Sequence, residues 1–166
     1  MTTQIKGNAT STFGGNIDVP QIVTNAPAFS AYLSSNQTVS TGTWTKITLD
    51  TKEFDTNSNY DNSTNYRFTP TVEGYYQFNS SISFIDLASG NISRHAIYKN
   101  GSRFKVSNQT YMGNAGYQIS TISTLIYMNG SSDYVEVYAI HAYGSNRDVN
   151  NGSDQTFFQA VLVRAA

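Results

Sequence analysis

One stretch of the chain has the spacing of a calcium-binding loop. Four oxygen-bearing side chains stand at alternate positions, namely Asp55, Asn57, Asn59 and Asp61. Alternating carboxylate and amide oxygens are ligands that Ca²⁺ prefers in proteins. Two requirements of such a loop are not met, because Tyr60 stands where the loop needs glycine and Tyr66 stands where a glutamate would close it. The stretch is therefore a candidate site for calcium, and the sequence predicts no other cofactor.

A second stretch near the C-terminus has a similar composition. Its oxygen-bearing side chains are Asp148, Asn150, Asn151 and Asp154. Asparagine, serine and threonine make up about a third of the chain, so groupings of this kind also arise without a metal. The alternative for both stretches is a polar loop in which this spacing arises by chance.

Residue types that carry catalysis are present but not arranged for it. His95 and His141 fall in expected strands, without an acidic neighbour in the sequence that could orient them. The serines lack the setting of a nucleophile elbow, and no glycine-rich phosphate loop links a strand to a helix. We therefore expect a binding or structural protein and not an enzyme.

Charge and hydropathy exclude several classes of partner. The net charge is −1, only 13% of residues are charged, and neither sign forms a run. A nucleic-acid-binding protein usually carries a basic stripe, which is missing. No apolar stretch approaches the roughly 18 residues that a membrane-spanning helix needs. The first residues, Met1 to Lys6, contain no apolar signal region, so we expect synthesis in a host cytoplasm without secretion.

The composition favours strands and turns. Twelve tyrosines and nine phenylalanines accompany the abundant threonine, asparagine and serine. Short runs with period-two alternation or strand-forming residues recur from Pro27 onward, at 28–33, 43–49, 66–69, 75–85, 95–98, 103–106, 117–128, 134–142 and 156–164. Asn100-Gly101 marks a tight hairpin turn. The sequence predicts an all-β sandwich over residues 26–166, preceded by an extended arm at 1–25 that is either a flexible tail or a strap onto another protein.

The last expected strand is apolar on both faces. Phe157-Phe158-Gln159-Ala160-Val161-Leu162-Val163 places apolar side chains at both even and odd positions, and residues 117–128 do the same. One face of a strand in a two-layer sandwich packs in the core, and the other face needs a further cover. A partner subunit is the cover that we expect.

Several blocks of the chain stand in the order found in a known family. They are Ala28-Phe29-Ser30-Ala31, Tyr66-Arg67-Phe68-Thr69-Pro70, Gly74-Tyr75-Tyr76-Gln77-Phe78, Thr124-Leu125-Ile126-Tyr127-Met128 and Thr156-Phe157-Phe158-Gln159-Ala160. In this order, over about residues 26–165, the chain resembles the tumour-necrosis-factor/C1q superfamily. Ser132 and Ala160 stand where the family usually has glycine, and no collagen-like stalk precedes the domain.

The resemblance implies a ten-stranded jelly-roll β-sandwich that assembles as a homotrimer. It also implies that the strands around Tyr75 and Phe157 lie near the threefold axis. On this basis we predict that Phe29, Tyr75, Tyr127 and Phe157 contribute to the trimer interface. The alternative for each of these side chains is ordinary core packing within one subunit.

Two functions agree with these features. The first is a non-enzymatic structural protein of a bacteriophage virion: a homotrimer on the virion surface that decorates or cements the capsid and is anchored to capsid proteins by residues 1–25. The second is a receptor- or glycan-binding tip of a phage tail fibre, or a lectin-like module of a bacterial surface. Its contacts would come from loop side chains, for which the candidates are Tyr111, Tyr117, Tyr143 and Asn146.

Overall fold

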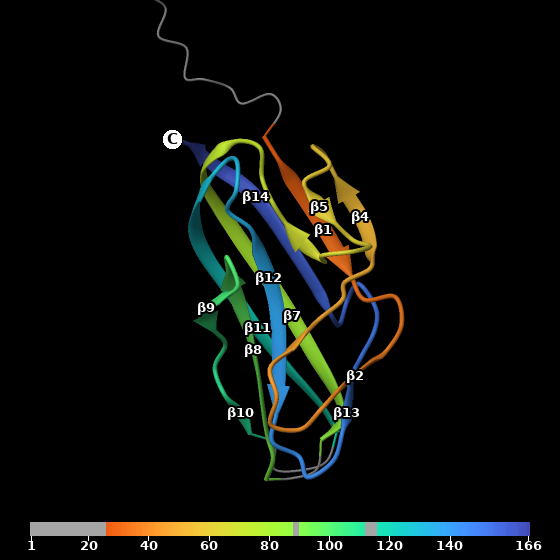
Figure 1. The fold of residues 1–166 in the computed structure, drawn as a ribbon. Helices are drawn as coiled ribbons and strands as arrows, with labels where there is room; N and C mark the ends of the chain where they lie inside the picture. Colours follow the sequence, from red (N-terminus) through yellow and green to blue (C-terminus); the bar gives the residue numbers. More distant parts are fainter. Residues whose placement is uncertain (1–25, 88–89, 112–115) are drawn as a thin grey trace, which may run out of the picture.

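The computed structural model describes residues 26–87, 90–111 and 116–166, and in this part every regular element is a strand (Figure 1). The predicted arm at residues 1–25 lies outside the described residues. The strands are β1 Ala28–Tyr32, β2 Gln37–Val39, β3 Thr45–Lys46, β4 Thr51–Asp55, β5 Tyr60–Asp61, β6 Arg67–Phe68, β7 Glu73–Leu87, β8 Ile92–Lys99, β9 Ser102–Val106, β10 Thr110–Tyr111, β11 Gly116–Asn129, β12 Val135–His141, β13 Arg147–Val149 and β14 Phe157–Ala165.

The strands form two antiparallel sheets that pack as a sandwich, as predicted. The first sheet runs β4-β1-β14-β7-β11, and β13 with β2 continues it along the far half of β7. In Figure 1 the first and last strands of the chain, β1 and β14, lie side by side in this sheet. The second sheet runs β5-β6-β12-β8, with β3 paired to β12 and both β9 and β10 paired to β8.

Aromatic side chains fill the space between the sheets. Phe29 of β1 has no exposed surface and stacks on Tyr60 and Phe68, with ring centroids 4.8 and 4.5 Å apart. Phe158 of β14 meets Phe29 edge to face at 5.1 Å. The predicted alternation of β7 is confirmed, since its inward residues Tyr76, Phe78, Ile82 and Phe84 are buried. Such rings bury large apolar areas, and this cluster holds the two layers together.

Two local predictions had different outcomes. The Asn100-Gly101 turn is confirmed, because both residues have positive φ, at 52° and 75°, as a tight hairpin requires. The expected strand at 43–49 is reduced to the two residues of β3. The Gln37 side chain accepts a hydrogen bond from Thr48 N and donates one to Lys46 O, so a side chain occupies backbone groups that a neighbouring strand would otherwise pair.

Candidate functional site

The outer surface of the first sheet carries large apolar side chains that nothing in the described chain covers. They come from four strands and are, with exposed fractions between 40% and 60%, Phe54, Tyr75, Tyr117, Ile119, Leu125, Tyr127, Val161 and Val163. We refer to this set as the apolar face. A monomeric protein rarely exposes this many large apolar side chains on one surface of a sheet, so the apolar face is a candidate interaction surface.

The strand register brings part of the apolar face together. Tyr127 of β11 lies opposite Tyr75 of β7, and their ring centroids are 5.6 Å apart. One step along, Gln77 lies between Leu125 on one neighbouring strand and Val161 on the other. Because side chains of a strand alternate between faces, these residues point away from the core while Tyr76, Ile126 and Leu162 point into it. The strands β11 and β14 are therefore apolar on both sides, because one side packs in the core and the other belongs to the apolar face.

Polar groups cross the middle of the apolar face. The Gln77 amide donates a hydrogen bond to Ser123 Oγ at 2.9 Å, and Asn79 and Gln159 lie opposite each other in the register. At the end of the face the Tyr127 hydroxyl donates to the Glu73 carboxylate, and this hydrogen bond raises the pKa of Tyr127. A partner on this face must therefore match a polar stripe as well as apolar side chains.

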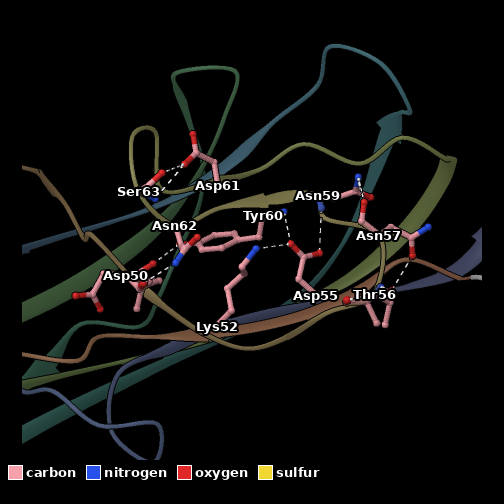
Figure 2. Close-up of polar contacts among 12 residues, drawn as sticks. Asp50, Lys52, Asp55, Thr56, Asn57, Asn59, Tyr60, Asp61, Asn62 and Ser63 are labelled. Carbon is pink, nitrogen blue, oxygen red and sulfur yellow. Dashed lines mark hydrogen bonds and ion pairs between the residues drawn. The ribbon is translucent and has the colours of Figure 1, made fainter.

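The predicted calcium stretch folds into two separate turns, each closed by its own carboxylate (Figure 2). Asp55 accepts hydrogen bonds from Asn59 N and Tyr60 N, both at 3.0 Å, and pairs with Lys52 at 3.3 Å. Asp61 accepts from backbone N–H groups of the following turn, including Thr64 N at 3.0 Å. These hydrogen bonds stabilise the charged form and hold the pKa of Asp61 well below its usual range.

No group of three or more His, Cys, Asp or Glu side chains that could hold a metal ion occurs among the residues that the structure describes. In the second polar stretch, Asp148 accepts a hydrogen bond from Thr38 Oγ1 at 2.7 Å. Asn151 donates to Ser34 O at 3.0 Å. Both stretches therefore have a role in joining strands, and calcium binding stays a prediction.

Comparison with known proteins identifies the architecture. No family model and no curated protein matches the chain. Among solved structures, the globular domain of zebrafish complement 1qA has a TM-score of 0.62 at 17% identity, over 85% of this chain and 99% of that one. Eiger TNF from S. frugiperda has a TM-score of 0.63 at 12% identity, over 85% and 93%. PRD1 vertex protein P5 has a TM-score of 0.58 at 17% identity, over 83% and 97%. The chain has the tumour-necrosis-factor/C1q jelly-roll fold.

Within this jelly roll, the four predicted interface residues separate into two groups. Tyr75 and Tyr127 belong to the apolar face, and the half-buried Phe157 lies on the same side of the sheet, opposite Ser81. The prediction for Phe29 is corrected, because its ring is enclosed in the core and has no surface for a partner. Phe29, Ala31 and Leu33 are apolar at alternate positions, and this pattern alone does not distinguish an inner face from a covered outer face.

The four predicted loop residues are only partly brought together. Tyr143 and Asn146 are close in the chain, and Arg147, the first residue of β13, lies over the Tyr143 ring at 3.6 Å. Asn146 and Arg147 line a hollow of about 370 Å³ at this end of the jelly roll. Tyr117 instead belongs to the apolar face, and Tyr111 lies in β10 with a side chain outside the described part.

The prediction omitted several residues of the apolar face, among them Leu125, Val161 and Val163. A signal for them was present, because residues an even number of positions apart on a strand share a face. Leu125 is two residues from the predicted Tyr127, and Val161 is four residues from the predicted Phe157. Val163 lies two residues further on, at the bulge near the end of β14.

No long apolar helix of the kind that crosses a membrane occurs in the described residues.

Proposed function

We propose that this protein is a non-enzymatic structural protein of a virion and that it acts as a homotrimer through the apolar face. The observation that carries the proposal is the row of exposed apolar side chains on β7, β11 and β14. Full burial of an apolar side chain contributes on the order of 1.5–3 kcal/mol. These side chains are 40–60% exposed, so each gains roughly half of that, and several per subunit together stabilise an oligomer. On this proposal, each subunit covers the apolar face of another copy of the same chain.

The virion location rests on two supporting observations. One solved structure with this fold is a vertex protein, PRD1 P5, which belongs to a phage. The chain is also rich in asparagine, serine and threonine and poor in charge, so neutral polar side chains hydrate it without a strong electrostatic field. On this proposal the trimer decorates or cements the capsid, and residues 1–25 bind the capsid proteins.

The oligomeric state is the first test. Light scattering of the full chain should give three times the 18.3 kDa of one chain. Leu125→Asp places a charge in the middle of the apolar face and should give a monomer. Ser102→Asp adds the same charge at an exposed position of the second sheet and should leave the trimer intact. A wild-type chain that is monomeric at all concentrations would contradict the proposal.

The anchoring role has its own test. Deletion of residues 1–25 should abolish binding to assembled capsids and leave the trimer mass, scaled to the shorter chain, unchanged. A trimer that still binds capsids without these residues contradicts anchoring by the arm, although it leaves the trimer itself in place.

A receptor-binding tip is the second candidate, and the hollow beside Asn146 and Arg147 favours it. A tip protein should bind host cells through this end of the jelly roll and keep that binding after loss of residues 1–25. Asn146→Ala together with Tyr143→Ala should then abolish cell binding without changing the trimer mass. Capsid binding that depends on the arm, combined with no cell binding, excludes this candidate.

A further inference from the structure

A second recess lies on the other side of the sandwich, on the outer surface of the second sheet. It has a volume of about 250 Å³. Arg94 of β8 and Ile140 of β12 are opposite each other in the register and form part of its lining. Trp44, which comes just before β3, and Arg103 of β9 also line it. We refer to this recess as the Trp44 pocket.

Among the residues that the structure describes, the two arginines of the Trp44 pocket have no acidic partner. Two other cations of the second sheet are paired, since Lys46 contacts Glu136 at 2.5 Å and Lys99 contacts Asp133 at 2.8 Å. In the same part of the chain, neither the Arg94 nor the Arg103 guanidinium makes an ion pair or donates a hydrogen bond to another protein group. The pocket therefore holds two positive charges that are available to a ligand.

The pocket also presents an aromatic wall whose position is fixed. The Arg103 guanidinium lies over the Trp44 ring at 5.5 Å, and the Trp44 ring is 6.2 Å from that of Tyr98. Because the Arg103 guanidinium donates no hydrogen bond to the described residues, its N–H donors are available to an anion. The half-buried Trp44 offers apolar ring surface beside those donors.

We infer that the Trp44 pocket binds a sugar acid, a pyranose ring that carries a carboxylate. The arginine side chains supply donors for the carboxylate, because Arg binds planar carboxylates through paired hydrogen bonds. The Trp44 ring and the Ile140 side chain match the apolar C–H face of the sugar. The volume is just below the range of pockets that enclose drug-sized ligands, which fits one ring and not a large ligand.

The location leaves this site independent of the proposed trimer. The Trp44 pocket is built on β8, β9 and β12 of the second sheet, and the apolar face belongs to the first sheet. Oligomerisation through the apolar face therefore leaves the pocket open. Failure of either proposal leaves the other intact, and mass measurements and sugar binding distinguish them.

Trp44 itself reports on binding, because it is the one tryptophan of the chain. Titration of the full chain with D-galacturonate should change the Trp44 fluorescence with saturation, and added salt should weaken the effect. The methyl ester of D-galacturonate has the same ring without the charge and should bind roughly tenfold more weakly or worse. D-glucuronate and N-acetylneuraminate, titrated in the same way, extend the test to other sugar acids.

The arginines are tested against a matched control. Arg94→Gln and Arg103→Gln should each weaken binding by roughly tenfold or more, as expected for loss of a charged hydrogen-bond donor. Arg67→Gln is the control, because Arg67 lies over the Tyr134 ring at 4.3 Å on the same sheet but does not line the pocket. It should bind like the wild type. Calorimetry repeats each measurement without relying on Trp44, and circular dichroism verifies that each variant is folded.

Four results would overturn the inference. Equal binding of the esterified sugar removes the role of the charges. Displacement by inorganic phosphate at the same concentration as the sugar acid reduces the pocket to a general anion site. Unchanged affinity in both Arg94→Gln and Arg103→Gln moves binding elsewhere. Absence of binding by all three sugar acids at millimolar concentration rejects the site.

Discussion

His95 is an ionisable residue enclosed in the core, where it joins the two sheets. Its Nε2 is 2.9 Å from Ser80 Oγ and its Nδ1 is 2.6 Å from Ser120 Oγ, and both serines belong to the first sheet. A hydroxyl can donate or accept, so these two serines satisfy the one donor and one acceptor of a neutral ring. Burial disfavours the charged ring and lowers the pKa of His95 to about 3. His95 is thus a neutral core contact between the two sheets.

This burial predicts a pH dependence of stability. In the unfolded chain His95 binds a proton below about pH 6.5, whereas in the folded chain its ring stays neutral down to about pH 3. The contribution of His95 to the free energy of unfolding is therefore complete above pH 6.5. It falls by up to about 1.4 kcal/mol per pH unit as the pH drops towards 3. His95→Gln keeps a donor and an acceptor without titrating, so this variant should lose that part of the slope in urea unfolding between pH 6.5 and 5.

The carboxylates do not obscure this measurement. Their ordinary pKa values lie below the window from pH 6.5 to 5, and that of Asp61 is lowered further by backbone hydrogen bonds. Protein concentration is held constant, because association also changes apparent stability. A His95→Gln variant with the same pH slope as the wild type would contradict a neutral buried His95.

At the scale of elements, the turn between β11 and β12 has little room for change. Asn129 Oδ1 accepts hydrogen bonds from three successive backbone N–H groups, those of Ser131, Ser132 and Asp133, at 2.9–3.1 Å. Gly130 within this turn has φ +68°, and a Cβ there would stand 2.4 Å from Glu73 N at the start of β7. The turn therefore fixes the end of β11 against the start of β7, where the two strands pair.

Gly130→Ala should therefore destabilise the protein by more than its φ alone explains. An alanine at positive φ costs about 1 kcal/mol, and the contact with the β7 backbone adds strain that should bring the total loss to roughly 2–4 kcal/mol. Gly42→Ala is the matched control, with φ +71° and nothing within 4 Å of the added Cβ. Urea unfolding of both variants separates the two effects. Equal losses would mean that the close approach at Gly130 relaxes without cost.

The elements also explain which predictions succeeded. The alternation of residues 75–85 is visible in the sequence, because one face of β7 packs in the core along its length. The strands β2 and β13 have three residues each and pair with each other across the chain, as Asp148 does with Thr38, so no local pattern marks them. The Trp44 pocket was missed for the same reason, since strand order and not spacing brings residues 44, 94, 103 and 140 together.

At the scale of the whole molecule, the two surfaces of the sandwich have different chemistry. The outer surface of the first sheet is apolar around a narrow polar stripe, with Leu125 and Val163 among its most exposed side chains. The second sheet instead carries ion pairs, stacked tyrosines and the arginines of the Trp44 pocket, and Phe104 and Val106 of its strand β9 are exposed as well. On our two proposals, the first surface mediates association between copies and the second binds a polar ligand. The same jelly roll would then assemble and bind at once.

Association through the first sheet predicts that the melting temperature depends on protein concentration. Three chains combine into one trimer, so a tenfold dilution disfavours the trimer by about 2.7 kcal/mol, or about 0.9 kcal/mol per chain. For a chain of this size, that lowers the melting temperature by roughly 2–4 °C. The Leu125→Asp variant should melt at a lower temperature that is independent of concentration, whereas Ser102→Asp should follow the wild type. A chelator should leave the wild-type melting temperature unchanged, because the fold and the apolar face are held by side-chain packing. A fall in melting temperature on chelation would instead support calcium at the turns of Asp55 and Asp61. A wild-type melting temperature that does not vary over a hundredfold range of concentration would contradict assembly coupled to folding.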